Sequence, residues 1–142
     1  MSSLVPYGVR IKKSDFEALT TRAKEGLPNE VCGLIAGRVE ENLRIIEKVY
    51  FMTNIDGSRE HFSIDPREQL RAVKDMRAAG LVPLGNFHSH PESPARPSEE
   101  DIRLAGDPSA SYLILSLAEE SPVLKAFHIE KGIVSPEELT IE

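Results

Sequence analysis

The stretch VPLGNFHSHPESPARPSEED, residues 82–101, decides how this chain is interpreted. Its apolar first part, residues 82–90, favours a buried β-strand. Three prolines follow and end regular strand pairing, because proline lacks a backbone N–H. Ser98 then precedes a run of acidic residues, which is typical of a helix N-terminus. We therefore predict a strand, a proline-stiffened connection, and a helix whose first turn contains Asp101.

This arrangement brings candidate metal ligands together. His88 and His90 are two residues apart, so on a strand their side chains project from the same face, about 6–7 Å apart along the chain. Two imidazoles and the Asp101 carboxylate form the ligand set of a catalytic zinc site, with a fourth position left for water. Two alternatives stay open. One histidine can be buried and the other solvated, and Ser98 with Asp101 can be a capping box without further function.

Outward from this stretch, helices alternate with strands. Ser14 is a predicted N-cap, with Glu17 completing a capping box and Gly26 ending the helix. Asp65 caps a second helix whose inner face we expect to contain Leu70, Val73 and Met76. The other predicted strands are residues 9–11, 31–39, 43–52 (the hairpin partner of 31–39), 61–64, 112–118 and 123–130, with a short one near the C-terminus. This pattern predicts an α/β or α+β domain built on a mixed sheet.

Composition narrows the class of protein. The 142 residues are expected to form one domain, residues 1–142, and the net charge of −6 argues against a general binder of nucleic acid or anionic membranes. No apolar run approaches the roughly 20 residues of a membrane span. The N-terminal segment MSSLVPYGVRIKKSDF shows no signal peptide, so we expect a cytoplasmic protein. The single cysteine, Cys32, excludes an internal disulfide and a cysteine-rich zinc site.

Glu30, the run His88-Ser89-His90-Pro91, Ser98 and Asp101 together resemble the signature of the JAMM (MPN+, Mov34/MPN/PAD-1) zinc metalloproteases. The segments EVCGLIAG, residues 30–37, and FSIDP, residues 62–66, add to the resemblance, which covers most of the chain. It implies a cytidine-deaminase-like α/β fold, with a curved mixed β-sheet flanked by about three helices.

The resemblance also implies a role for each residue of the motif. His88, His90 and Asp101 would bind one Zn²⁺ per chain, Glu30 would be the general base, and Ser98 would stabilise the oxyanion. Partial burial of Glu30 would raise its pKa toward the useful range. Without the joint pattern, the sequence alone favours a solvated acid in a loop for Glu30.

The chain resembles the small prokaryotic members, because it has no obvious insertion after Asp101. The implied substrate is a ubiquitin-like or sulfur-carrier protein, cleaved after a C-terminal Gly-Gly tail. The alternative is a non-catalytic MPN-type scaffold or interaction module. A zinc deaminase is excluded, because its Pro-Cys-x-x-Cys element needs two cysteines. The oligomeric state stays open, a homodimer included.

Other residues admit two interpretations. Cys32 can share a face with Glu30 and bind zinc, or it can be a small core residue. His61 and His128 match no motif and are taken as structural or solvated. Glu99 and Glu100 are better explained by the helix start than as ligands. Glu92 and Arg96 are expected to flank the cleft.

Overall fold

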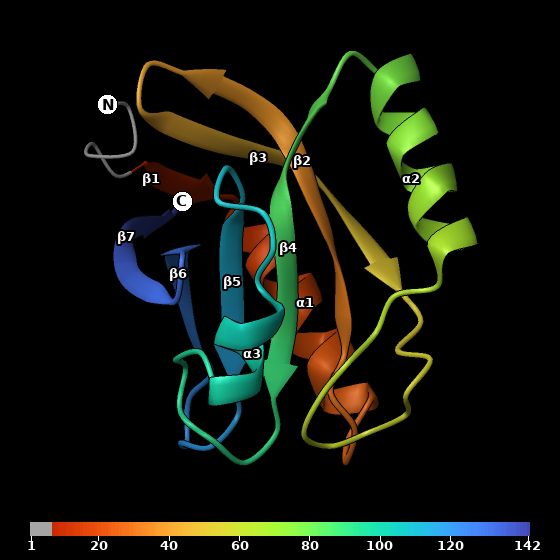
Figure 1. Cartoon of the computed structure of the whole chain (residues 1–142), viewed down its shortest axis with the longest axis vertical. Helices are drawn as coiled ribbons and strands as arrows, with labels where there is room; N and C mark the ends of the chain where they lie inside the picture. The colour runs from red at the N-terminus through yellow and green to blue at the C-terminus, as the bar shows by residue number, and fades with distance from the viewer. Residues whose placement is uncertain (1–6) are drawn as a thin grey trace.

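A computed structural model describes residues 7–142 (Figure 1). Its elements, in chain order, are β1 (Gly8–Ile11), α1 (Lys13–Glu25), β2 (Cys32–Glu40), β3 (Leu43–Met52), α2 (Pro66–Ala78), β4 (Val82–His90), α3 (Glu99–Leu104), β5 (Ser111–Ser116), β6 (Val123–Glu130) and β7 (Ile133–Ile141). The expected mixed α/β fold is confirmed. Of the residues described, none belongs to a helix with the length and hydropathy that a bilayer span requires.

The strands form one mixed sheet in the order β1-β3-β2-β4-β5-β6-β7, which curves until it closes into a barrel. The seam is β1, which runs parallel to both β3 and β7. β4 lies near the middle of the order, antiparallel to β2 and parallel to β5. Because β4 has a partner on each side, the strand that carries both histidines is held along its length.

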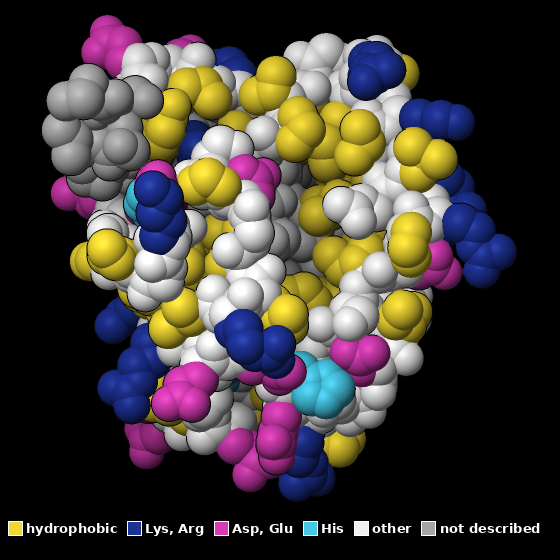
Figure 2. Space-filling view, in the orientation of Figure 1, with side chains coloured by type: hydrophobic (Ala, Val, Ile, Leu, Met, Phe, Trp, Pro, Cys, Tyr) yellow, Lys and Arg dark blue, Asp and Glu magenta, His cyan; other side chains and the backbone are white. Residues whose placement is uncertain are grey.

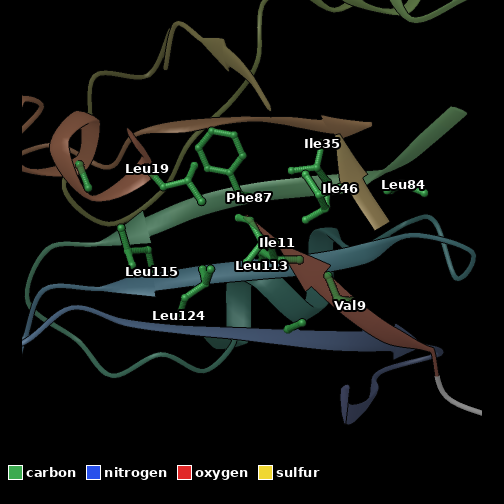
Figure 3. Packing of buried hydrophobic residues seen from close by; sticks show 12 residues of the cluster. Val9, Ile11, Leu19, Ile35, Ile46, Leu84, Phe87, Leu113, Leu115 and Leu124 are labelled. Carbon is green, nitrogen blue, oxygen red and sulfur yellow. The ribbon is translucent and has the colours of Figure 1, made fainter. Parts of the chain in front are cut away.

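Both faces of the central strands are buried. Ile35 of β2 and Phe87 of β4 belong to the main core, together with Leu19 and Ala23 of α1 (Figure 3). The neighbours of Ile35, Leu34 and Ala36, point the other way and pack against α2. The two helices therefore cover opposite faces of β2, which makes this part of the sheet a rigid support for the end of β4.

Two local predictions are wrong. Lys12, not Ser14, is the N-cap of α1, and no side chain caps it, so the capping box with Glu17 is absent. Residues 61–64 do not form a strand. Only an isolated bridge joins Ile64 to Asn54. The backbone groups of His61 and Ser63 are hydrogen-bonded to the Asn54 side chain instead of to a neighbouring strand.

The inner face of α2 also differs from the prediction. Leu70 is 55% exposed, and the buried residues are Ala72 and Met76. Ala72 and Met76 pack with Leu34 and Ala36 of β2, so the helix face that meets the sheet does not contain Leu70. The predicted cap is confirmed, since the Asp65 side chain accepts a hydrogen bond from the Arg67 N–H at 2.8 Å. The N-terminal segment in which we expected no signal peptide begins with residues 1–6, which lie outside the described residues.

Candidate metal centre

His88 and His90 are placed by the last residues of β4. Both are buried, at 3% and 2% exposure, on one face of the strand. Ser89, between them, points the other way, and its Oγ accepts a hydrogen bond from the Val31 N–H at 2.8 Å. The predicted alternation is therefore present, and the middle residue anchors the strand while its neighbours face the candidate site.

Asp101 reaches the histidines through the proline-rich turn and α3. Ser98 is the N-cap of this short helix, and both bonds of a capping box are formed. The Ser98 Oγ accepts from the Asp101 N–H at 3.0 Å, and the Ser98 N–H donates to Asp101 Oδ2 at 2.9 Å. That same Oδ2 lies 3.1 Å from the Nε2 atoms of both His88 and His90. The capping box and the three-residue cluster are thus one arrangement, not alternatives.

The cluster fits a single divalent cation. The two Nε2 atoms are 3.1 Å apart, so the three ligand atoms form a nearly equilateral triangle. Ligand atoms of a tetrahedral zinc ion are about 3.3 Å apart, given bonds of roughly 2.0–2.1 Å. His90 Nδ1 lies 2.8 Å from the Pro94 carbonyl oxygen, which only accepts, so Nδ1 carries a proton. In the neutral ring, the Nε2 lone pair then faces a carboxylate oxygen, and the two repel each other. A cation bound between them removes this repulsion.

Charge and burial act together at this cluster. Burial lowers the pKa of His88. Burial opposes the charged form of His90 as well, but hydrogen bonds to Asp101 and Pro94 raise its pKa. Burial of Asp101 favours its neutral form, yet the two imidazoles hold the pKa of its carboxyl well below the usual value. The aspartate is therefore an anion between two imidazoles, as a metal ligand must be.

Glu30 precedes β2 and is held by its backbone. Its N–H donates to the Ser58 carbonyl at 2.7 Å, and its carbonyl accepts from Asn54 Nδ2 at 3.0 Å. The side chain is 4% exposed, and its Oε1 atom is buried without a hydrogen-bond partner. Burial raises the pKa of Glu30 to about 8. The solvated-acid interpretation is therefore wrong.

Two cavities adjoin the cluster. The first, here called the acidic cavity, has a volume of about 660 Å³ and contains Glu30, His90 and Ser98 in its lining. The second, here called the apolar cavity, is about 230 Å³. Phe62, Leu104 and Ile114 contribute to its lining, as do His88 and Asp101. The three-residue cluster lies between a charged space and an apolar one.

A family model described as prokaryotic homologues of the JAB domain matches residues 12–130. The chain belongs to this family. A CysO-cysteine peptidase from Mycobacterium tuberculosis is 31% identical to this JAB-domain protein over 136 residues, which cover 95% of this chain and 92% of the relative. A protein from Thermus thermophilus described as a probable TtuB-protein conjugate cleaving protease is 39% identical over 79 residues, covering 55% and 50% of the two chains.

Solved structures agree with this assignment. A solution structure from Desulfitobacterium hafniense superposes with a TM-score of 0.88 at 56% identity, covering 94% of this chain and 92% of the other. A JAB1/MPN domain protein from Archaeoglobus fulgidus superposes with a TM-score of 0.59 at 21% identity, covering 94% and 98%. The second likeness concerns the fold alone, which is that of a JAB/MPN domain.

The JAB-domain site also uses residues that the sequence did not single out for a role. Phe62 stacks on the His88 ring, with centroids 4.7 Å apart and planes inclined by 26°. Asn54 joins the loop of residues 53–64 to Glu30, because its amide donates to two carbonyls while its Oδ1 accepts from Asp56 and Ser63. An asparagine in a polar loop carries no periodic signal, so only the resemblance around Phe62 pointed to this region.

Cys32 is a core residue and not part of the cluster. It is 1% exposed, packs with Met52 and Met76, and has its thiol pKa raised by burial to about 12. His61 is exposed beside Asp56, and His128 lies near Glu130, so both match the structural or solvated interpretation.

The flanking charges divide into two groups. Glu92, Glu99 and Glu100 line the acidic cavity, whereas Arg96 is absent from the described lining. Neither Glu99 nor Glu100 joins the three-residue metal cluster among the described residues.

Proposed function

We propose that this JAB-domain protein is a zinc-dependent peptidase that hydrolyses the bond after the C-terminal Gly-Gly of a ubiquitin-like or sulfur-carrier protein. The supporting observation is the pairing of a buried, unpartnered Glu30 carboxyl with the His88, His90 and Asp101 cluster at one cavity. A non-catalytic scaffold, the alternative function, has no need to bury an unsatisfied carboxyl, which costs free energy unless it has a task.

In this proposal His88, His90 and Asp101 hold one zinc ion. When bound there, zinc supplies a Lewis acid that activates water and polarises the scissile carbonyl. The protein contributes the orientation of the ligands. The Pro94 carbonyl fixes the His90 tautomer, Phe62 fixes the plane of the His88 ring, and the Ser98 N–H holds Asp101 Oδ2.

Glu30 is the proposed general base. Its raised pKa suits a carboxyl that accepts a proton from the attacking water and then passes it to the nitrogen of the leaving amine. Ser98 is the proposed oxyanion donor. Its Oγ already accepts the capping bond from Asp101, but that bond leaves the hydroxyl proton free to donate. Capping and catalysis therefore use different parts of the same hydroxyl.

The proposed substrate class rests on the names of the relatives. One relative is named for a carrier–cysteine bond and another for a carrier–protein conjugate. The first is named a CysO-cysteine peptidase and the second a probable TtuB-protein conjugate cleaving protease. For the protein described here we further propose a single domain located in the cytoplasm.

The decisive experiment is incubation with a panel of ubiquitin-like and sulfur-carrier proteins extended beyond Gly-Gly, followed by intact mass. Cleavage directly after Gly-Gly, lost with a chelator and restored by zinc, is the expected result. Glu30→Gln should keep one zinc per chain and lose turnover. Turnover that persists in Glu30→Gln would remove Glu30 from the mechanism, and a zinc-loaded protein that cuts no member of the panel would overturn the proposed function.

A further inference from the structure

The acidic cavity has an unbalanced charge. Besides Glu30, four glutamate carboxyl groups belong to its described lining, those of Glu60, Glu92, Glu99 and Glu100, against one guanidinium, that of Arg59. Arg59 is engaged with Glu92 at 3.5 Å. Glu100 has Arg103 at 3.2 Å, while no ion pair involves Glu60 or Glu99 within residues 7–142. Figure 2 shows Asp and Glu side chains at the lower end of the molecule, with Lys and Arg side chains among them.

A second observation assigns this cavity to one side of the scissile bond. Glu30 is 4% exposed, and its Oε1 has no hydrogen-bond partner among the described residues, so it is available to the attacking water and then to the leaving nitrogen. A base that returns its proton to the leaving nitrogen must lie within hydrogen-bond reach of that nitrogen. Glu30 lines the acidic cavity and does not line the apolar one. The amine side of the substrate therefore belongs in the acidic cavity.

From these observations, and on the basis of the proposed function, we infer that the acidic cavity is a leaving-group subsite that selects by charge. It favours a lysine side chain of a conjugated protein with basic neighbours. It disfavours a single amino acid as the leaving group. The free α-carboxylate of such a group lies next to the scissile nitrogen and would be repelled by Glu60, Glu92 and Glu99. Between the two kinds of bond named among the relatives, the charge of this cavity favours the protein conjugate.

The chemistry of the step agrees with this selection. Water supplies a hydroxyl to the acyl carbon, the carbon–nitrogen bond breaks, and the proton taken by Glu30 goes to the nitrogen. The amine product is an ammonium ion at neutral pH, so surrounding carboxylates stabilise its charge as it develops. A free α-carboxylate beside it would instead lie close to several like charges.

The test uses one carrier protein with three leaving groups and the zinc-loaded full chain. These are cysteine with a free carboxylate, cysteine amide, and a lysine linked through Nζ within an Arg-Lys-Arg peptide. We expect kcat/KM for the amide to exceed that for the free acid by about tenfold, as follows for several carboxylates near one charge. The difference should shrink between about 0.05 M and about 1 M salt, as the screening length falls.

Matched variants identify the residues. Glu99→Gln and Glu60→Gln remove charge with little change of shape. Each should reduce the ratio of kcat/KM for the cysteine amide to kcat/KM for the free acid. Glu41→Lys is the control, because Glu41 is exposed in the turn between β2 and β3, at the far end of β2 from the site. Equal rates for the acid and the amide, or a preference that both glutamine variants leave unchanged, would overturn the inference while the proposed function stands.

A binding measurement separates the two proposals. A fluorescent Arg-Lys-Arg peptide and its Glu-Lys-Glu counterpart are titrated into the zinc-loaded protein, with Glu99→Gln alongside. Tighter binding of the basic peptide that weakens in Glu99→Gln supports the subsite, even if no carrier fusion is cut and the proposed function falls. Equal binding of the two peptides contradicts the subsite independently of any activity.

Discussion

Ser89 and Val31 are joined by two hydrogen bonds. The Val31 N–H donates to Ser89 Oγ at 2.8 Å, and the Ser89 N–H donates to the Val31 carbonyl at 2.9 Å. Ser89 lies between the two histidines, and Val31 directly follows Glu30. This pair of residues therefore ties the segment before β2, which contains the proposed base, to β4, which contains the two histidines.

Ser89→Ala should weaken the connection between β4 and the segment that contains Glu30. Val31 would lose a partner for its N–H in a partly buried position, which costs about 1–3 kcal/mol of stability. We expect kcat to fall more than zinc content, because the histidines keep their strand. Denaturant unfolding, zinc analysis and cleavage rates measure the three quantities. Ser14→Ala, at an exposed residue that caps nothing, is the matched control and should change stability by less than about 0.5 kcal/mol.

Asn54→Ala should make Glu30 less firmly held, because a different hydrogen bond, the one from Asn54 to the Glu30 carbonyl, is lost. The amide that holds the Glu30 carbonyl and organises the loop of residues 53–64 would be lost. We predict faster amide exchange at Ser63 and at Asp56, together with slower cleavage and normal zinc content. Gln69→Ala on the exposed face of α2 serves as the comparison. Unchanged exchange in the loop would show that Asn54 does not organise it.

Metal removal should lower stability if the cluster binds zinc in the native state alone. The gain on binding is RT ln(1 + [L]/Kd), about 2.7 kcal/mol at a free zinc concentration one hundred times Kd. His90→Ala should abolish both the zinc and this gain, whereas His128→Ala, at a residue outside the cluster, should keep both. Thermal unfolding with and without chelator gives the result. A gain that survives in His90→Ala would place the metal elsewhere.

The free energy of unfolding of the metal-free protein should depend on pH through the titration of Glu30. Burial raises its pKa from 4.5 to about 8, so the folded state binds the proton more tightly than the unfolded state. This contribution to stability is complete below about pH 4.5 and is lost as pH rises toward 8. Glu30→Gln cannot ionise, so its advantage over the unmodified protein should grow across that window. Denaturant unfolding in chelator at several pH values measures it, and parallel curves for the two proteins would refute the shift.

Much of the site was predictable because its signals are local. The alternation of His88, Ser89 and His90 and the cap at Ser98 depend on short-range geometry, and the structure places them as expected. Predictions failed where packing between residues far apart in the sequence determines which side chains are buried. Leu70 has the right spacing for an inner face, but contact with the sheet selected Ala72 and Met76 instead.

Long-range hydrogen bonding is equally invisible in the sequence. The bonds of Asn54 to residues 30 and 61 span separations that no periodicity encodes. The same holds for the charge of the acidic cavity, because the fold brings Glu60 beside Glu92 and Glu99, which lie more than 30 residues further along the chain. The sequence points to candidate reacting groups, and tertiary structure decides their surroundings.

The seam of the barrel rests on short contacts, since β1 pairs with β3 over Gly8–Arg10 and with β7 over Gly8–Ile11. Short ladders fray first, so transient opening should begin there. β4 is separated from β1 by β3 and β2 in one direction and by β7, β6 and β5 in the other. Opening of the sheet at this seam would therefore leave the spacing of His88 and His90 intact.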